Sequence, residues 1–200
     1  KELMSKDPKQ FDAENKLVIP SAIAADRNAI AYVRQHASEY NIKPDKIGII
    51  GFSAGGTVAA SAAFHYSAEN RPDFVAPIYP FLPDSMQTVV PNDAPPMFIA
   101  AASDDALGLA PHSLSLYQKW LTSKHPVELH MYVKGGHGFG MRQQNIPTDA
   151  WIYRFGDWLQ TEGFAKGVAS PNAQQAENMQ RTLQDWANLH RYKDENESLT

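Results

Sequence analysis

The sequence predicts an α/β fold built on a largely parallel sheet. Short apolar runs of four to seven residues alternate with segments of ten or more residues that have helical spacing, which is the pattern of strands joined by crossover helices. With 200 residues and 43% hydrophobic content, the chain can fill one core. Polar residues with catalytic chemistry follow directly after three of the apolar runs. In a parallel sheet these positions meet at the edge where ligands bind.

Each element follows from its local pattern. Apolar residues after Ser21 are spaced for one helical face, and serine is a good N-cap. The β-branched run over 47–50 suits a buried strand, whereas the proline within 73–79 weakens that strand. We expect, in chain order, a polar connection over 1–16, a helix from Ser21 to about Tyr40, a strand over 47–50, a helix over 54–66, a strand over 73–79, a long proline-rich loop over 80–96, a strand over 97–101, a helix over 112–122, a strand over 127–133 and a helix over 148–161.

The junction between the first strand and its helix contains Gly51-Phe52-Ser53-Ala54-Gly55, a match to G-x-S-x-G. In this motif a serine stands on a tight strand-to-helix turn, so its hydroxyl projects clear of the sheet. We expect both flanking glycines to be sterically required, because a side chain does not fit beside so sharp a bend. Ser53 is therefore a candidate nucleophile, and the alternative is a serine that only shapes the turn.

Two further strand ends supply the partners that a serine nucleophile needs. A serine hydroxyl requires a base, for which histidine has a suitable pKa, and a carboxylate then orients the histidine. His137 lies in the glycine-rich segment 134–140 after a strand, whereas the other six histidines fall on helices, in a turn or within a strand. Asp104 and Asp105 both leave the strand over 97–101, and either can be the acid.

Acyl transfer also needs hydrogen-bond donors for the developing oxyanion. The backbone N–H of Ala54, directly after the nucleophile, is expected to supply one. The second donor commonly comes from an H-G-G-G-type loop earlier in the chain, but residues 1–45 contain no glycine. We therefore expect the N-terminal part of the domain to be incomplete. No H-E-x-x-H motif or histidine pair at ligand spacing is present, so we predict neither a metal nor another cofactor.

The charge and composition of the chain limit the classes of partner that we expect it to bind. A net charge of −4 and a pI near 6.0 argue against nucleic acid or an anionic membrane surface. No apolar run is long enough to span a bilayer. The chain has no cysteine, which excludes thiol catalysis and disulfides but leaves the compartment open, and its first residues are charged and polar rather than a signal peptide.

The segments Ile49-Ile-Gly-Phe-Ser-Ala-Gly-Gly56 and Tyr132-Val-Lys-Gly-Gly-His-Gly-Phe-Gly140 resemble the α/β-hydrolase superfamily, and most closely its acetylxylan-esterase-like or feruloyl-esterase-like serine esterases. The resemblance covers about residues 15–164. It implies an α/β-hydrolase fold, with a mostly parallel sheet flanked by helices, that is incomplete at the N-terminus. Members carry the acid about eight residues before a serine that begins an S-x-x-L-Y helix; counting back from Ser113 favours Asp105 over Asp104.

Domain organisation follows from the extent of this resemblance. We predict a partial catalytic domain over 1–164, followed over 165–200 by a linker and a C-terminal helix. The helical part is similar to the lead-in of SGNH (GDSL-type) esterases, although their G-D-S block is absent. Residues 165–200 are therefore either the start of a further domain or a terminal helix.

The resulting hypothesis is a serine carboxylesterase in which Ser53, His137 and Asp105 form a catalytic triad. The resemblance implies short acyl esters, among them acetyl groups on plant polysaccharide, as small-molecule or carbohydrate substrates, and it fits a secreted or periplasmic protein. One alternative is a prolyl-oligopeptidase-type serine peptidase, which uses the same triad. Another is an inactive hydrolase-fold binding module. A fragment that lacks early strands is also expected to be able to complete its sheet by self-association or with a complementary segment.

Overall fold

The computed structural model describes residues 8–82, 89–166 and 181, with side chains from Ser21 onward. The chain divides into two compact units, Lys1–Trp151 and Ile152–Thr200. The first unit contains the sheet and all the predicted site residues. Within the described ranges, no helix combines the length and the apolar character needed to cross a membrane.

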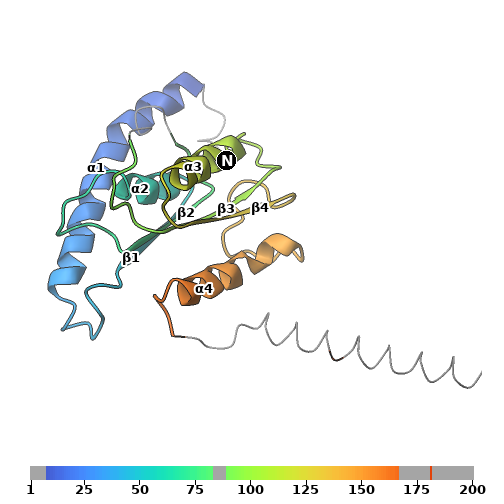
Figure 1. Ribbon diagram of the computed structural model, residues 1–200. Coiled ribbons are helices and arrows are strands. Elements are labelled where there is room, and N and C mark those ends of the chain that lie inside the picture. The colour runs from blue at the N-terminus through green and yellow to red at the C-terminus, as the bar shows by residue number, and fades with distance from the viewer. Residues whose placement is uncertain (1–7, 83–88, 167–180, 182–200) are drawn as a thin grey trace, which may run out of the picture. The chain divides into compact units, whose positions relative to one another are not determined.

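Four parallel strands form the sheet of the first unit, in the spatial order β1-β2-β3-β4 (Figure 1). Parallel neighbours need crossover connections, and α2 (Ala54–Ala62) joins β1 to β2 while α3 (Ala110–Thr122) joins β3 to β4. The predicted α/β class and parallel sheet are therefore confirmed. The strands are β1 (Gly48–Phe52), β2 (Phe74–Ile78), β3 (Met97–Ala102) and β4 (Val127–Tyr132).

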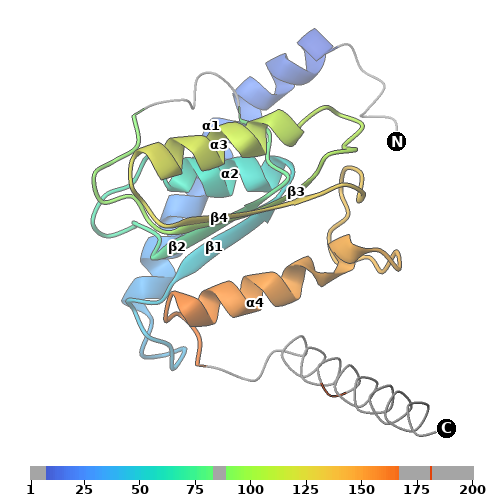
Figure 2. The ribbon, with the colours of Figure 1, turned by 45° about the vertical axis from the view of Figure 1, so that its right-hand side comes forward.

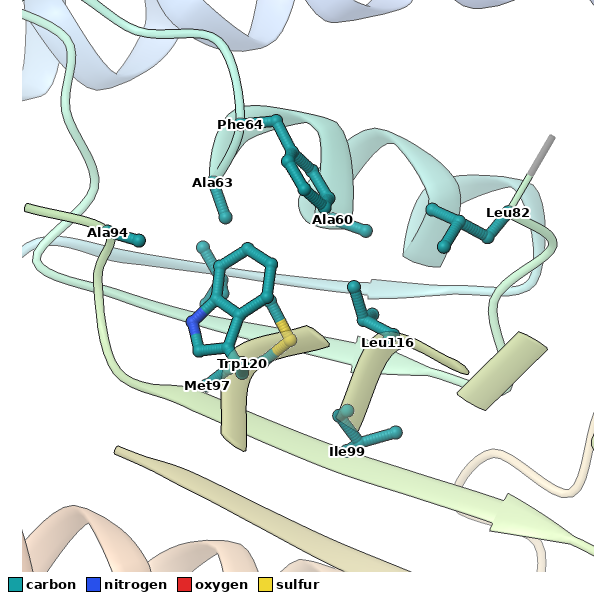
Figure 3. Packing of buried hydrophobic residues seen from close by; sticks show 10 residues of the cluster. Ala60, Ala63, Phe64, Leu82, Ala94, Met97, Ile99, Leu116 and Trp120 are labelled. Carbon is teal, nitrogen blue, oxygen red and sulfur yellow. The ribbon is translucent and has the colours of Figure 1, made fainter. Parts of the chain in front are cut away.

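The core of this unit lies between the sheet and the helices α2 and α3, which cover the same face (Figure 2). Side chains alternate between the two faces of a strand, so Met97 and Ile99 of β3 point to the helices together. Trp120 of α3 lies over them and donates its Nε1–H to the Pro95 carbonyl at 2.8 Å. Figure 3 shows this cluster, whose buried members are Ala60, Ala63, Phe64, Val75, Leu82, Ala94, Met97, Ile99, Leu116 and Trp120.

Pro77 lies inside β2, an interior strand, although proline cannot donate to a sheet ladder. The residues two positions before and two positions after Pro77 do donate toward β3. The Val75 N–H donates to Pro96 O at 3.0 Å, and the Tyr79 N–H donates to Ala100 O at 2.8 Å. Pro77 stands between them, where that edge of the strand lacks one donor. The sheet accommodates this gap because its two neighbouring bonds are kept.

The long helix α1 (Pro8–Gln35) differs from the prediction at both ends. The predicted polar connection over 1–16 is wrong from Pro8 onward, and Ser21 is not the N-cap but lies within the helix. Residues 9–17 include lysine, glutamine, alanine and glutamate, which are good helix formers, and proline is favoured in a first turn because it has no N–H to leave unpaired. The helix ends five residues earlier than Tyr40.

Arg34, near the end of α1, fixes the segments that lead into β1 and β2. Its guanidinium donates to the carbonyls of Pro44 and Glu69 and to the Asp73 carboxylate, each at 2.9 Å. Asp73 also accepts from Ile47 N–H at 2.8 Å. One side chain therefore ties a helix to the starts of two strands.

The remaining elements agree with the predictions except at their ends. The helix expected over 54–66 ends at Ala62, and that over 148–161 consists of a 3₁₀ turn (Pro147–Ala150) followed by α4 (Trp151–Thr161). The boundary at 164/165 stays a prediction, and most of the expected linker and terminal helix lies outside the described residues, as do positions 83–88 of the proline-rich loop.

Candidate active site

Ser53 stands at the turn between β1 and α2 with φ 54° and ψ −118°. A non-glycine residue rarely adopts a positive φ, and such strain is common where a side chain must be presented at a site. The turn is held by the Ser53 N–H, which donates to Ile78 O at 3.0 Å, and by the Thr57 N–H, which donates to Ser53 O at 3.0 Å. Both bonds use backbone atoms of Ser53, so the turn does not require the hydroxyl, which can bind another partner.

The glycines around Ser53 do not have equal roles. A Cβ on Gly51 would lie 2.0 Å from the carbonyl oxygen of Gly55, so this glycine is sterically required, as predicted. The same expectation for Gly55 is wrong, because a Cβ there would meet no atom within 4 Å. Gly56 is the second constrained position: its Cβ would lie 2.9 Å from Ile78 O. The close approach is thus between the first turn of α2 and the ends of β1 and β2.

His137 lies in the loop after β4, 84 residues from Ser53 in sequence, and its Nε2 is 2.8 Å from Ser53 Oγ. The loop bends sharply at three glycines with positive φ, Gly136, Gly138 and Gly140. Glycine adopts this conformation without steric cost. The histidine ring is therefore brought back over the carboxyl ends of the strands, with 12% of its side chain exposed.

Asp105 follows β3 and presents one carboxylate oxygen, Oδ2, 2.8 Å from Nδ1 of His137. The other oxygen, Oδ1, accepts the backbone N–H of Leu107 at 2.8 Å. Only 1% of this side chain is exposed, so the carboxylate is both buried and occupied on each oxygen. Ser53, His137 and Asp105 thus form one continuous hydrogen-bonded chain.

The order of these contacts determines the protonation pattern of the site. A carboxylate only accepts, so the His137 Nδ1–H donates to Asp105, which leaves Nε2 as the acceptor for the Ser53 hydroxyl proton. This is the tautomer that a general base requires. The arrangement can deprotonate Ser53 and stabilise the imidazolium that results.

Asp104, the alternative acid, is placed elsewhere. Its Oδ1 accepts the backbone N–H of Gly136 at 2.8 Å, and its Oδ2 is 3.6 Å from the Lys134 ammonium. The Gly136 hydrogen bond is the main cause that lowers the pKa of Asp104, with a smaller contribution from the charge of Lys134. The two adjacent aspartates therefore contact different parts of the same loop, one the histidine ring and the other its backbone.

Tyr79 is a site residue that the sequence did not indicate. It directly follows β2, as Ser53 follows β1, and has φ 39°. Its ring packs edge-on against His137 with 5.1 Å between centroids, and against Phe139 at 4.6 Å. Burial is the largest cause that raises the pKa of its hydroxyl. Because the strand was predicted to run through residue 79, no sequence signal marked this tyrosine.

Trp151 and Thr148 hold the histidine loop by hydrogen bonds to its backbone. The Trp151 Nε1–H donates to Gly140 O at 2.7 Å, and the Thr148 hydroxyl donates to Lys134 O. These bonds fix the carbonyls at the two ends of the loop.

Ala54, predicted to donate to the oxyanion, is the first residue of α2 and is exposed. The first N–H groups of a helix have no intrahelical acceptor. The Ala54 N–H is therefore geometrically able to bind an anion that forms next to Ser53, and its role stays a prediction.

Comparison with known proteins identifies the group to which this site belongs. The model of the "Dienelactone hydrolase family" matches residues 2–187. The chain belongs to the dienelactone hydrolase family. The resemblance to α/β-hydrolase esterases is thereby confirmed, and the family is one of hydrolases.

Two curated relatives and one solved structure are similar to the chain. It is 25% identical to an acetylxylan esterase of Xylanibacter ruminicola over 159 residues, covering 64% of the chain and 33% of the relative. It is 27% identical to endo-1,4-beta-xylanase B of Butyrivibrio fibrisolvens over 146 residues, covering 55% and 23%. The crystal structure of an acetyl ester-xyloside bifunctional hydrolase from Caldicellulosiruptor lactoaceticus superposes with a TM-score of 0.65 at 26% identity, covering 71% of this chain and 66% of that one.

The chain spans a third or less of the length of these curated relatives. The likeness is therefore to a part of each relative. It supports an acetylxylan-esterase-like hydrolase, which agrees with the resemblance found in the sequence.

Proposed function

We propose that this dienelactone hydrolase family member is a serine carboxylesterase that removes short acyl groups, acetyl among them, from carbohydrate esters. The observation that carries the proposal is the hydrogen-bonded chain from Ser53 through His137 to Asp105, with both contacts to the imidazole at 2.8 Å. The names of an acetylxylan esterase and an acetyl ester-xyloside hydrolase among the similar proteins support the acyl and alcohol classes.

The reaction that we propose has two halves. Ser53 Oγ attacks the ester carbonyl while its proton moves to His137 Nε2, and the Ala54 N–H donates to the oxygen that becomes negative. The imidazolium, stabilised by Asp105, then gives that proton to the leaving alcohol oxygen as the ester C–O bond breaks. Water repeats the sequence on the acyl-Ser53 ester, which releases the acid and restores the serine.

The first test is replacement of the nucleophile. We expect Ser53→Ala to lower kcat on p-nitrophenyl acetate by more than about 10⁴-fold, because the remaining groups cannot form the acyl-enzyme. The matched control is Ser103→Ala, an exposed serine beside the site, which should retain activity. Hydrolysis by Ser53→Ala at a rate near that of the wild type would refute the proposal.

A second measurement separates an esterase from the alternatives. A fluorophosphonate probe should add covalently to Ser53 in the wild type and not in Ser53→Ala, and mass spectrometry of the tryptic peptide reports the site. Absence of labelling in the wild type would favour an inactive binding module. Faster turnover of peptide p-nitroanilides than of acetyl esters would favour a peptidase.

A further inference from the structure

His137 lies between two glycines, which have no side chain to hold their own backbone in place. On the C-terminal side, the Gly138 carbonyl accepts a hydrogen bond from Arg142 Nη2 at 2.8 Å. Gly136 and Gly138 have φ of 66° and 74°, and a Cβ built on either one would meet no atom within 4 Å. Glycine has more accessible backbone states than any other residue. A loop of this kind needs specific hydrogen bonds if it is to hold the imidazole 2.8 Å from Ser53 Oγ.

Gly136, the residue that precedes His137, makes such a bond. The N–H of Gly136 donates to Asp104 Oδ1 at 2.8 Å, over a sequence separation of 32 residues. Asp104 is anchored in turn, because it leaves the end of β3, whose six residues are all buried. The contact therefore joins a glycine of the histidine loop to the end of a fully buried strand.

We propose that Asp104 is a positioning residue for the reaction: it fixes the Gly136 peptide and thereby sets where the His137 imidazole stands relative to Ser53. The proposal rests on the proposed function, since it assigns a role around the same triad. Asp105 acts on the ring and Asp104 acts on the backbone one residue before it. Consecutive aspartates thus hold both the orientation and the position of one histidine.

The acceptor oxygen, rather than the ion pair, carries this role. The Lys134 ammonium is 3.6 Å from Asp104 Oδ2 and its side chain is 71% exposed, and exposed pairs of this kind contribute little. Asp104→Asn keeps an amide oxygen where Oδ1 accepts, whereas Asp104→Ala removes it. Lys134→Met leaves the acceptor in place and removes only the charge partner.

The experiment compares these three variants with wild type and with Asp149→Ala. Asp149 is a matched control because its carboxylate also accepts backbone N–H groups nearby, from Gln144 at 2.8 Å and Asn145 at 2.7 Å, without touching His137. The measurements are kcat and KM on p-nitrophenyl acetate, the rate of fluorophosphonate labelling of Ser53, and hydrogen–deuterium exchange of the peptide over 134–141.

We expect Asp104→Ala to lower kcat and the labelling rate by roughly 10- to 100-fold, as a displacement near 1 Å does at a catalytic group, with KM within about threefold of wild type. Exchange over 134–141 should rise in the same variant. Asp104→Asn, Lys134→Met and Asp149→Ala should stay within about threefold in every rate. Rescue by asparagine together with a change in kcat rather than KM distinguishes positioning from general support of the fold.

Two results would overturn the proposal: wild-type rates in Asp104→Ala, or rates in Asp104→Asn as low as in Asp104→Ala. Failure of the proposed function is a different outcome, namely a wild type that neither turns over esters nor labels at Ser53. In that event the exchange measurement decides the inference about Asp104, because unchanged exchange over 134–141 in Asp104→Ala would refute it without reference to activity.

Discussion

Replacing Asp105 by asparagine tests the triad most sharply, because the two oxygens of this carboxylate have different partners. Oδ1 accepts from Leu107 N–H and Oδ2 accepts from His137 Nδ1–H, both at 2.8 Å. Asparagine offers one acceptor and one donor group in the same space. If its oxygen faces Leu107, its NH₂ faces Nδ1 of the imidazole, which must then be unprotonated. The ring proton moves to Nε2, and Ser53 loses its base.

The opposite amide orientation is disfavoured by the same two contacts. It would turn the NH₂ toward the Leu107 N–H, so that two donors face each other at a side chain that is 1% exposed. A buried donor left without an acceptor costs about 1–3 kcal/mol, which favours the first orientation by roughly 5- to 150-fold. We therefore expect Asp105→Asn to reduce kcat by about 10⁴-fold, the effect of holding a triad histidine in the wrong tautomer.

The assay is kcat on p-nitrophenyl acetate at neutral pH, with thermal unfolding to show that the variant is folded. Asp104→Asn is the control, because it makes the same chemical change one residue away and keeps the acceptor for Gly136. A folded Asp105→Asn variant with kcat within tenfold of wild type would refute the assignment of Asp105 as the acid. A large loss in Asp104→Asn together with activity in Asp105→Asn would exchange their roles.

Two further predictions concern stability. Burial raises the pKa of Asp26 from 3.8 to about 6, against the opposing charge of Arg27. Because the pKa is higher in the folded state than in the unfolded state, the contribution of Asp26 to folding stability is fully present below about pH 4 and is lost as the pH rises through 6. At pH 7.5 the free energy of unfolding in urea should therefore be about 1–2 kcal/mol higher for Asp26→Asn than for wild type, after allowance for solvent screening. At pH 4 the two proteins should be equally stable. If the variant and wild type were equally stable at both pH values, the burial argument would be contradicted. Gly51→Ala should destabilise the fold by about 3 kcal/mol and abolish fluorophosphonate labelling of Ser53, because the new Cβ would meet the Gly55 carbonyl. Gly55→Ala is the control: its Cβ would lie in open space, so this variant should unfold like wild type. Similar stability of the two glycine variants in thermal and urea unfolding would exclude this steric account.

The three strand ends that carry Ser53, Asp105 and His137 could be predicted because their signals are local. An apolar run, a turn and a polar residue can each be read from a few neighbouring letters, and a parallel sheet then brings the carboxyl ends together. The choice between Asp104 and Asp105 could not be made in this way, since both leave the same strand. The choice depends on the turn after β3, which directs the Asp105 carboxylate to the His137 ring and the Asp104 carboxylate to the Gly136 N–H.

Two other features could not be predicted, each for its own reason. The predicted start of α1 was wrong because Pro20 disfavours a helix interior, yet it lies within this helix of 28 residues. The positive φ of Tyr79 is equally hidden, because tyrosine has no intrinsic preference for it. The contacts of Tyr79 with His137 and Phe139 in the folded chain reveal it.

Positions with positive φ in this site differ in whether they carry a side chain. Ser53 and Tyr79 directly follow the adjacent strands β1 and β2, and both have positive φ although each is a non-glycine residue, at a cost of about 1–2 kcal/mol apiece. Both positions require a side chain, one as the nucleophile and the other as a ring against His137. In the histidine loop the same conformation falls on Gly136, Gly138 and Gly140, where only the backbone is used and glycine avoids the cost. The flexibility that these glycines introduce is the reason that the loop needs an external acceptor, and Asp104 is placed to provide it.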